Sequence, residues 1–313
     1  MIPTKEQLLK ARAIVEPYTH ATPVLTSQLL NDMVGAEVYF KCENFQKMGA
    51  FKMRGAVHKI MNLTKEQRSR GVVTHSSGNF GQAVALSAKN LGVKAYVVMP
   101  SNAPQVKKDA VRSYGGVITE CEATIAARER ETQRIEEETG ATFMHPSNDM
   151  DVILGNSTAA AELLEAESDL DYIFSPIGGG GLIAGTALAA HHFGNQCKTI
   201  GGEPMEADDA YRSLLSGMIE TNQTAHTIAD GLRTYLGDQN FPIIQQLVTQ
   251  IIRVEEQEII EAMQLIWERM KIIIEPSSAV AFAAVLKNKE QFLGKSIGLI
   301  VSGGNIDVRN LPF

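Results

Sequence analysis

The residues best suited to bind an anion form the longest glycine run in the chain: Gly178, Gly179, Gly180 and Gly181. The run separates a β-like segment, 172–175, from a helical pattern at 183–193. Glycines between a strand and a helix expose consecutive backbone N–H groups, and the helix N-terminus adds about half a positive charge. Because side chains would block the approach of a ligand, the run predicts a phosphate-binding loop.

The same glycines leave a second class of ligand open. Gly179-x-Gly181-x-x-Ala184 fits a relaxed dinucleotide fingerprint, and Glu203 ends a later predicted strand. An NAD-dependent oxidoreductase is therefore one alternative on these residues alone. A non-catalytic amino-acid-binding regulator is another.

Two polar glycine turns follow other predicted strands. Ser76-Ser77-Gly78-Asn79 comes directly after the strand predicted at 71–75, and Ser302-Gly303-Gly304-Asn305 follows the strand predicted at 297–301. Each turn could simply cap a helix. Because ligands of parallel α/β sheets bind beyond the carboxyl ends of strands, the two turns and the glycine run together indicate one site. Such a site has a phosphate end and a polar ring end.

Lys52 is the residue whose amine could form a covalent bond to a ligand. It stands between Phe51 and Met53 in a polar segment that leads into a predicted helix. An amine beside apolar walls loses its proton more readily, as Schiff-base chemistry requires. A surface lysine whose methylene stem covers an apolar edge has the same local sequence.

These motifs, taken in order, resemble those of the pyridoxal-phosphate enzymes of fold type II, the tryptophan-synthase β fold. Within that group the chain is similar to serine racemases and to serine/threonine dehydratases. The resemblance covers nearly the whole chain and rests on Phe51-Lys52-x-Arg54-Gly55-Ala56, Ser76-Ser77-Gly78-Asn79, the four glycines 178–181, Ser302-Gly303-Gly304-Asn305, Thr22-Pro23-Val24-Leu25-Thr26-Ser27, Trp267-Glu268-Arg269-Met270-Lys271 and Glu275-Pro276.

The resemblance implies a role for each matching residue. Lys52 would form the Schiff base with pyridoxal phosphate and move the Cα proton, and Ser77 would serve the opposite face of the substrate. Asn79 would bond the phenolic oxygen of the cofactor, and Ser302 the pyridine nitrogen. The expected cofactor contacts are Lys52, Phe51, Asn79, Gly178, Gly179, Gly180, Gly181, Leu182 and Ser302. The expected substrate contacts are Ser76, Ser77, Asn79, Gln82 and Arg128.

The resemblance also implies a reaction, namely β-elimination of L-serine or L-threonine to a 2-oxo acid and ammonia, accompanied by serine racemase activity. Racemisation as the main activity is an alternative, and so is dehydration of 3-hydroxyaspartate. Phe80 bears on this choice, because the family usually has histidine after Ser-Ser-Gly-Asn. An aromatic ring there replaces a hydrogen-bond donor beside the substrate.

A metal site and a nucleotide site are further expectations from the resemblance. The segment 203–209 holds four carboxylates in seven residues, which suits Mg²⁺, Ca²⁺ or Mn²⁺ but also fits a solvated acidic turn. Serine racemases use the positions that match Glu203, Ala207 and Asp209. ATP as an activator would contact Gln82, Lys107 and Ala110, at a homodimer interface. Lys107-Lys108 equally fits an exposed helix face.

Short β-branched runs alternate with helical patterns along the chain, which predicts an α/β fold with parallel sheets covered on both faces. Strands are predicted at 38–41, 71–75, 95–99, 117–120, 172–175, 199–203 and 297–301. Helices are predicted at 56–63, 82–91, 104–114, 124–139, 156–165, 183–193, 259–270 and 278–286, with a further N-terminal helix capped by Thr4 and Gln7. With the resemblance, this becomes two doubly wound domains with the cofactor in the cleft between them. The large one comprises 1–70 and 149–313, and 71–148 forms a small mobile one.

Composition excludes other classes of protein. The 313 residues include 29 Lys+Arg and 36 Asp+Glu, a net charge of −7, which disfavours nucleic acid as a partner. No apolar stretch is long enough to span a membrane. Three cysteines without a CxxC motif favour reduced thiols and a cytoplasmic location. The chain is expected to carry no appended regulatory domain.

Overall fold

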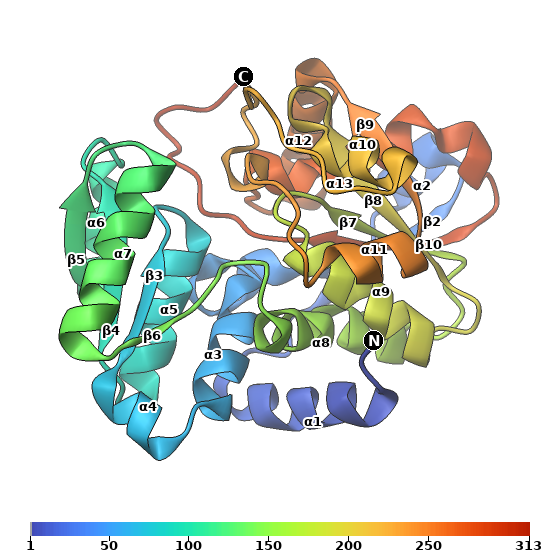
Figure 1. The fold of residues 1–313 in the computed structure, drawn as a ribbon. Coiled ribbons are helices and arrows are strands. Elements are labelled where there is room, and N and C mark those ends of the chain that lie inside the picture. Colours follow the sequence, from blue (N-terminus) through green and yellow to red (C-terminus); the bar gives the residue numbers. More distant parts are fainter. Residues whose placement is uncertain (1) are drawn as a thin grey trace.

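The computed structural model describes residues 2–313, and its strands form two separate sheets (Figure 1). The strands are β1 (Val24–Leu25), β2 (Glu37–Cys42), β3 (Val72–His75), β4 (Ala95–Pro100), β5 (Val117–Cys121), β6 (Thr142–Phe143), β7 (Tyr172–Pro176), β8 (Lys198–Pro204), β9 (Val248–Val254) and β10 (Ser296–Val301).

The larger sheet has six strands in the order β1-β2-β10-β7-β8-β9. Only the short edge strand β1 is antiparallel to its neighbour, and the other pairs are parallel. The smaller sheet has four parallel strands in the order β5-β4-β3-β6. The predicted α/β class with parallel-rich sheets is therefore confirmed.

Helices connect the parallel strands. They are α1 (Lys5–Val15), α2 (Gln28–Val34), α3 (Lys52–Asn62), α4 (Lys65–Arg70), α5 (Asn79–Asn90), α6 (Gln105–Ser113), α7 (Ile125–Thr139), α8 (Met150–Ala166), α9 (Gly181–Phe193), α10 (Asp209–Ser216), α11 (Phe241–Leu247), α12 (Glu256–Met270) and α13 (Pro276–Lys287). Single 3-10 turns complete the fold, among them Asp230–Leu232.

Alternate residues of the strands pack against helices on opposite faces of each sheet. In β7, Phe174 joins the apolar cluster of α12 and α13, whereas Ile173 joins that of α8 and α9. In β4, Val97 packs with α5 and α6, and Val98 with α7. Helix α3 contacts both α5 of the smaller unit and α8 of the larger one, so it lies where the two units meet (Figure 1).

Each predicted strand and helix is present, with ends that differ by a few residues. The capping box of Thr4 and Gln7 is confirmed at the start of α1. Three strands were not predicted: β1 and β6, which have two residues each, and β9, whose apolar residues are interrupted by Thr249, Gln250 and Arg253. The proposed domain boundaries at 70/71 and 148/149 fall in segments that connect the two sheets, between α4 and β3 and between β6 and α8. Among residues 2–313, no helix combines the length and apolarity needed to cross a bilayer.

Candidate active site

The four motifs singled out in the sequence all follow strands at their carboxyl ends. The segment leading to Lys52 follows β2, and the turn 76–79 joins β3 to α5. The four glycines 178–181 join β7 to α9, and Ser302 comes directly after β10. In a parallel sheet these ends share one edge, so the larger sheet gathers three of the motifs, whereas the turn 76–79 comes from β3 of the smaller sheet.

Hydrogen bonds then link the motifs to one another. The backbone N–H of Phe51 donates to the carbonyl oxygen of Ser302 at 3.0 Å, and Ala50 forms an antiparallel bridge with Gly303. Asn305 Nδ2 donates to Asn79 Oδ1 at 2.9 Å. Three motifs from distant parts of the chain therefore form one hydrogen-bonded assembly.

Lys52 is the first residue of α3, and its amine lies beside two aromatic rings. Nζ is 4.9 Å from the ring centroid of Phe51 and 5.5 Å from that of Phe80. It donates a hydrogen bond to the carbonyl oxygen of Pro146 at 2.7 Å. Burial lowers the pKa of Lys52 to about 8, and the charge of Glu275 limits this decrease. A useful fraction of the amine is therefore neutral, and nucleophilic, near neutral pH.

This lowered pKa predicts how the pH controls bond formation at Lys52. Below pH 8 the neutral fraction falls about tenfold per pH unit, whereas above pH 8 it saturates. The rate at which the aldehyde absorbance of pyridoxal phosphate is lost on mixing with the cofactor-free protein should follow this curve. An ordinary lysine, with a pKa near 10.4, would give a rate that keeps rising up to about pH 10. That outcome would show that burial does not lower the pKa of Lys52.

The four glycines form a cradle that has no room for side chains. A Cβ on Gly179 would lie 2.3 Å from Ser147 Oγ, and one on Gly178 would lie 2.8 Å from the Cα of Leu232. Gly180 has a φ of 80°, which disfavours any side chain. Asn240 Nδ2 donates to the carbonyl oxygen of Gly179 at 2.8 Å and so fixes the loop. The cradle precedes α9, whose N-terminus attracts anions.

The ring end of the expected site also has defined partners. The hydroxyls of Ser302 and Ser278 lie 2.9 Å apart, and Ser278 Oγ also bonds both backbone groups of Gly303. Phe51 and Leu182 belong to one apolar cluster that can flank a planar ring. The lysine, the glycine cradle, the hydroxyl and the apolar wall fit the chemical groups of pyridoxal phosphate.

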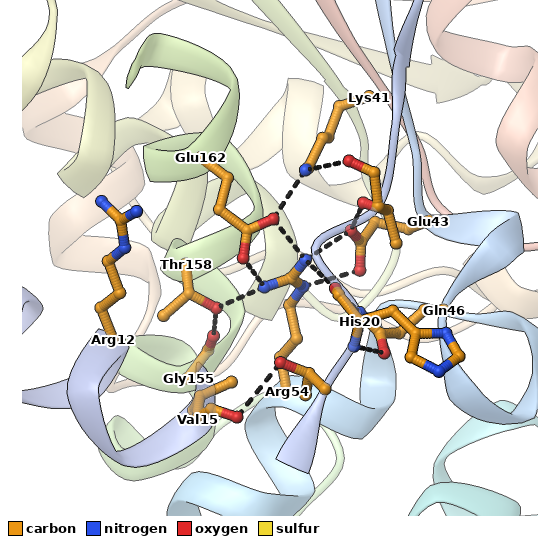
Figure 2. Close-up of polar contacts among 12 residues, drawn as sticks. Arg12, Val15, His20, Lys41, Glu43, Gln46, Arg54, Gly155, Thr158 and Glu162 are labelled. Carbon is orange, nitrogen blue, oxygen red and sulfur yellow. Dashed lines mark hydrogen bonds and ion pairs between the residues drawn. The ribbon is translucent and has the colours of Figure 1, made fainter. Parts of the chain in front are cut away.

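A buried ion cluster fixes the start of α3 (Figure 2). The guanidinium of Arg54 is fully buried and binds both carboxylate oxygens of Glu43, at 2.7 and 2.8 Å. It also donates to Glu162 and to Thr158 Oγ1. Lys41 completes the cluster through Glu162 at 2.6 Å. Two cations and two anions therefore balance, and Arg54 ties the start of α3, which carries Lys52, to the 3-10 turn after β2 and to α8.

The residues expected to bind substrate lie around the turn after β3. Ser76 Oγ accepts from the backbone N–H of Gly78 at 3.3 Å, and Ser77 is half-buried in the same turn. Gln82 is buried one turn into α5. Arg128, on α7, has no carboxylate in ion-pair contact in the described part of the chain. Burial of His75 is the main cause of its lowered pKa, and the charge of Arg128 is the second cause.

The expected metal residues lie at the end of β8. Glu203 and Asp209 are 0% and 1% exposed, and Ala207 lies between them in a 3-10 turn. Glu203 accepts from the backbone N–H groups of Ala210 and Tyr211, at 2.9 and 2.8 Å. Burial, and then the charge of Asp209, hold the pKa of Glu203 well above its usual range. Within residues 2–313, no three His, Cys, Asp or Glu side chains form a metal-binding group, and this set offers two carboxylates and one carbonyl.

Among the residues expected to contact a nucleotide, Lys107 already has an ion-pair partner in the structure. Lys107 and Ala110 lie one turn apart on α6. The ammonium of Lys107 pairs with Asp230 at 2.6 Å, and Asp230 belongs to the turn that covers Gly178. This ion pair connects the smaller unit to the larger one.

Sequence reasoning assigned no role to several residues that contact the motifs: Pro146, Ser147, Asn240, Glu275 and Ser278. Glu275-Pro276 signals a helix start, but nothing in its local sequence points to Asn79, which lies 196 positions away. A role for Asn305 could have been predicted from the sequence, because it is the last residue of the Ser302-Gly303-Gly304-Asn305 motif.

Comparisons with known proteins agree with this geometry. The profile of a family described as "Pyridoxal-phosphate dependent enzyme" matches residues 15–303. The chain is 46% identical to a β-hydroxyaspartate dehydratase of Paracoccus denitrificans, over 100% of this chain and 99% of the relative. It is 48% identical to a serine racemase of Dictyostelium discoideum, over 98% and 96%.

Solved structures show the same fold. The crystal structure of the Dictyostelium discoideum serine racemase matches with a TM-score of 0.93, over 97% of this chain and 98% of the other. The structure of maize serine racemase matches with a TM-score of 0.96 at 44% identity, over 99% and 95%. Together with the motif assembly around Lys52, these matches establish that the chain belongs to the pyridoxal-phosphate-dependent enzymes of fold type II.

Proposed function

We propose that this enzyme dehydrates small β-hydroxy amino acids such as L-serine and L-threonine, and that it also racemises serine. The single observation that carries the proposal is the amine of Lys52, held beside two aromatic rings within an assembly that joins the turn 76–79 to the turn 302–305. The bound cofactor supplies an electron sink for the charge that develops at Cα. A hydroxyl beside the pyridine nitrogen, where other enzymes place a carboxylate, weakens that sink and favours prompt loss of the β-hydroxyl.

Residues of this chain then supply proton transfer, binding of the substrate carboxylate and exclusion of water. Lys52 takes the Cα proton, the N–H groups of the turn 76–79 orient the carboxylate, and Phe51 and Phe80 exclude water from the amine. The β-hydroxyl leaves with a proton as water. The enamine that is released hydrolyses to the 2-oxo acid and ammonia. Racemisation requires a proton donor on the opposite face of Cα, a role that we assign to Ser77.

Ser77→Ala separates the two activities. Without the hydroxyl, D-serine formation from L-serine should fall about 10²–10⁴-fold, whereas elimination of L-serine stays measurable, because Lys52 acts on that face. Chiral chromatography and a keto-acid assay on the same sample give both rates. Equal losses of racemisation and elimination would show that Ser77 does not serve one face alone.

Arg128 favours a second candidate, dehydration of 3-hydroxyaspartate. Its guanidinium has no carboxylate partner among residues 2–313 and lies near His75, at the end of the strand that carries the substrate turn. An arginine in that position suits a substrate with a second carboxylate. Two relatives are named for this reaction, the Paracoccus denitrificans dehydratase and an L-threo-3-hydroxyaspartate ammonia-lyase of Saccharomyces cerevisiae.

One experiment tests both candidates. The purified enzyme is incubated with L-serine, D-serine, L-threonine and L-threo-3-hydroxyaspartate, and the keto acid and the enantiomers are measured together. A kcat/KM for hydroxyaspartate at least about tenfold above that for serine, or 1.4 kcal/mol of transition-state preference, selects the second candidate. The reverse order selects the first. No keto acid and no inversion from any of the four substrates would overturn the proposed function.

We infer in addition that a divalent cation binds at Glu203, the carbonyl of Ala207 and Asp209. Within the described residues both carboxylates bond only to N–H groups, of the backbone and of Asn222, and such burial without a cation is costly. Mg²⁺ at about 100 times its Kd should stabilise the fold by about 2.7 kcal/mol. Thermal unfolding with Mg²⁺ and with EDTA measures the shift, which Asp209→Asn should abolish. A melting temperature that is insensitive to both would contradict the site.

Nucleotide activation, a homodimer, a cytoplasmic location and a mobile 71–148 domain complete the proposal. A nucleotide phosphate that reached Lys107 would have to displace Asp230. ATP would therefore loosen a contact between the two units as it binds.

A further inference from the structure

Glu275 occupies the N-cap position of α13, yet its side chain does not cap that helix. A side chain at this position usually accepts a hydrogen bond from the first turn of its own helix. Here the residue is 5% exposed and its carboxylate turns toward α5 instead, where it accepts from Asn79 Nδ2 at 2.9 Å to Oε1 and 3.1 Å to Oε2. The buried charge is thus directed at the side-chain amide of Asn79, with a further contribution from the backbone N–H of Asn305.

The Asn79 amide is held from both ends. Its Oδ1 accepts from Asn305 Nδ2 at 2.9 Å, and Asn305 Nδ2 donates a second bond to the carbonyl oxygen of Met48 at 2.8 Å. A backbone carbonyl can only accept, so the orientation of Asn305 is fixed, and it presents a donor to Asn79. An ionised carboxylate can only accept as well, so Glu275 requires the nitrogen of Asn79.

This leaves one free donor on Asn79. Of its two Nδ2 hydrogens, one points to Glu275, and the other has no acceptor among residues 2–313. A flipped amide would place Oδ1 against the carboxylate and would offer an acceptor where a donor is needed. The phenolic oxygen of the cofactor carries negative charge, so the amide orientation decides whether Asn79 attracts or repels it.

We propose that Glu275 is a positioning residue: it fixes the Asn79 amide so that its free N–H faces the phenolic oxygen of the cofactor. The inference rests on the proposed function, since it assumes that the cofactor binds at Lys52. Glu275 bonds the expected cofactor contact Asn79, and its charge also acts on Lys52. It also joins α13 of the larger unit to α5 of the smaller one, so the correct amide orientation exists only when the two units are in contact.

The charged groups around Glu275 set the pH at which its role is tested. Burial, with a contribution from Asp230, raises the pKa of Glu275 to about 7. The hydrogen bond from Asn79, the charge of Lys107 and the backbone N–H of Asn305 act in the opposite direction on this pKa. Lys52 feels the charge of Glu275 as well. Measurements at about pH 8.5 keep the carboxylate ionised, since this is more than one unit above that pKa.

The test compares Glu275→Met, which removes the acceptor, with Glu275→Gln, which can still present an oxygen to Asn79. Each is made in the wild-type background and in Asn79→Ala, and pyridoxal phosphate is titrated into the cofactor-free protein. In the wild-type background Glu275→Met should raise the Kd of the cofactor about 10- to 100-fold and shift the visible absorption maximum, and Glu275→Gln should restore both. In Asn79→Ala, Glu275→Met should change the Kd less than about twofold.

Two results would overturn the inference: an unchanged absorption maximum in Glu275→Met, or an equal loss of affinity in both backgrounds. Either would make Glu275 a part of the scaffold that does not act through Asn79. If Glu275→Met does not fold, Asn305→Leu replaces it, because that substitution removes the hydrogen bond from Asn305 to Asn79 Oδ1. It is made in the same two backgrounds, and the same changes in Kd and absorption maximum are expected. A wild-type protein that binds no pyridoxal phosphate contradicts the proposed function itself, which is a separate outcome.

Discussion

Lys52→Ala is expected to yield a colourless protein with turnover reduced about 10³-fold or more, because the same amine both bonds the cofactor and moves the Cα proton. No other described lysine amine lies between the rings of Phe51 and Phe80, so no neighbour can replace it. Absorption spectra after reconstitution and a keto-acid assay measure the two losses. Borohydride reduction followed by peptide mass spectrometry locates the bond in the wild-type protein.

Lys10→Ala provides the matched control, because Lys10 lies exposed on α1. That variant should keep both the colour and the turnover. A reducible chromophore that survived in Lys52→Ala would place the bond on another lysine and would refute the assignment of the site.

Arg54→Met is expected to destabilise the fold by about 3–5 kcal/mol, a large part of the roughly 5–15 kcal/mol typical of a whole domain. The substitution keeps an unbranched side chain there but leaves the fully buried carboxylate of Glu43 without its cation. Because Arg54 lies two residues after Lys52, cofactor affinity should fall as well. Urea unfolding followed by circular dichroism gives the stability.

Two variants show whether burial of the charge is the cause. Arg134 pairs with Glu138 on the exposed face of α7, so Arg134→Met should cost less than about 1 kcal/mol. Adding Glu43→Gln to Arg54→Met should recover part of the loss, because it removes the unpaired charge. Similar costs at Arg54 and Arg134 would mean that the cluster contributes little.

The sequence did not predict the short helices α2, α4, α10 and α11, and it placed several starts of the other helices too late. Glycine explains the late starts. The predicted starts at 56, 82 and 156 each follow a glycine, a residue that weakens helices. In the structure these glycines, Gly55, Gly81 and Gly155, lie inside the helices, which begin at Lys52, Asn79 and Met150. A Cβ on Gly155 would lie 2.6 Å from the carbonyl oxygen of Arg54, so glycine is required where α3 and α8 cross. Helix propensity depends on the local sequence, whereas the requirement for glycine depends on the close approach of two helices that are far apart in the sequence.

The candidate site shows the same limit. The lysine, the glycine run and the two polar turns could be found because each is contiguous in sequence. The lowered pKa of Lys52 could not, because it depends on burial that only the packed fold creates. Glu275 was singled out only as part of the family resemblance, because its carboxylate contacts Asn79 only when α13 packs beside the start of α5. Polar networks that join distant segments leave no local pattern to read.

The strand order also determines when the larger sheet can form on the ribosome. β10 lies between β2 and β7, although it is the last strand in the described chain. The smaller sheet has all its strands once residue 143 is made, whereas β2 must wait for residues 296–301. At about 5–20 residues per second, the nascent chain spends on the order of 10–50 s with the apolar edge of β2 unpaired. During that interval the edge of β2 lacks its partner strand β10 and is open to pairing with other chains.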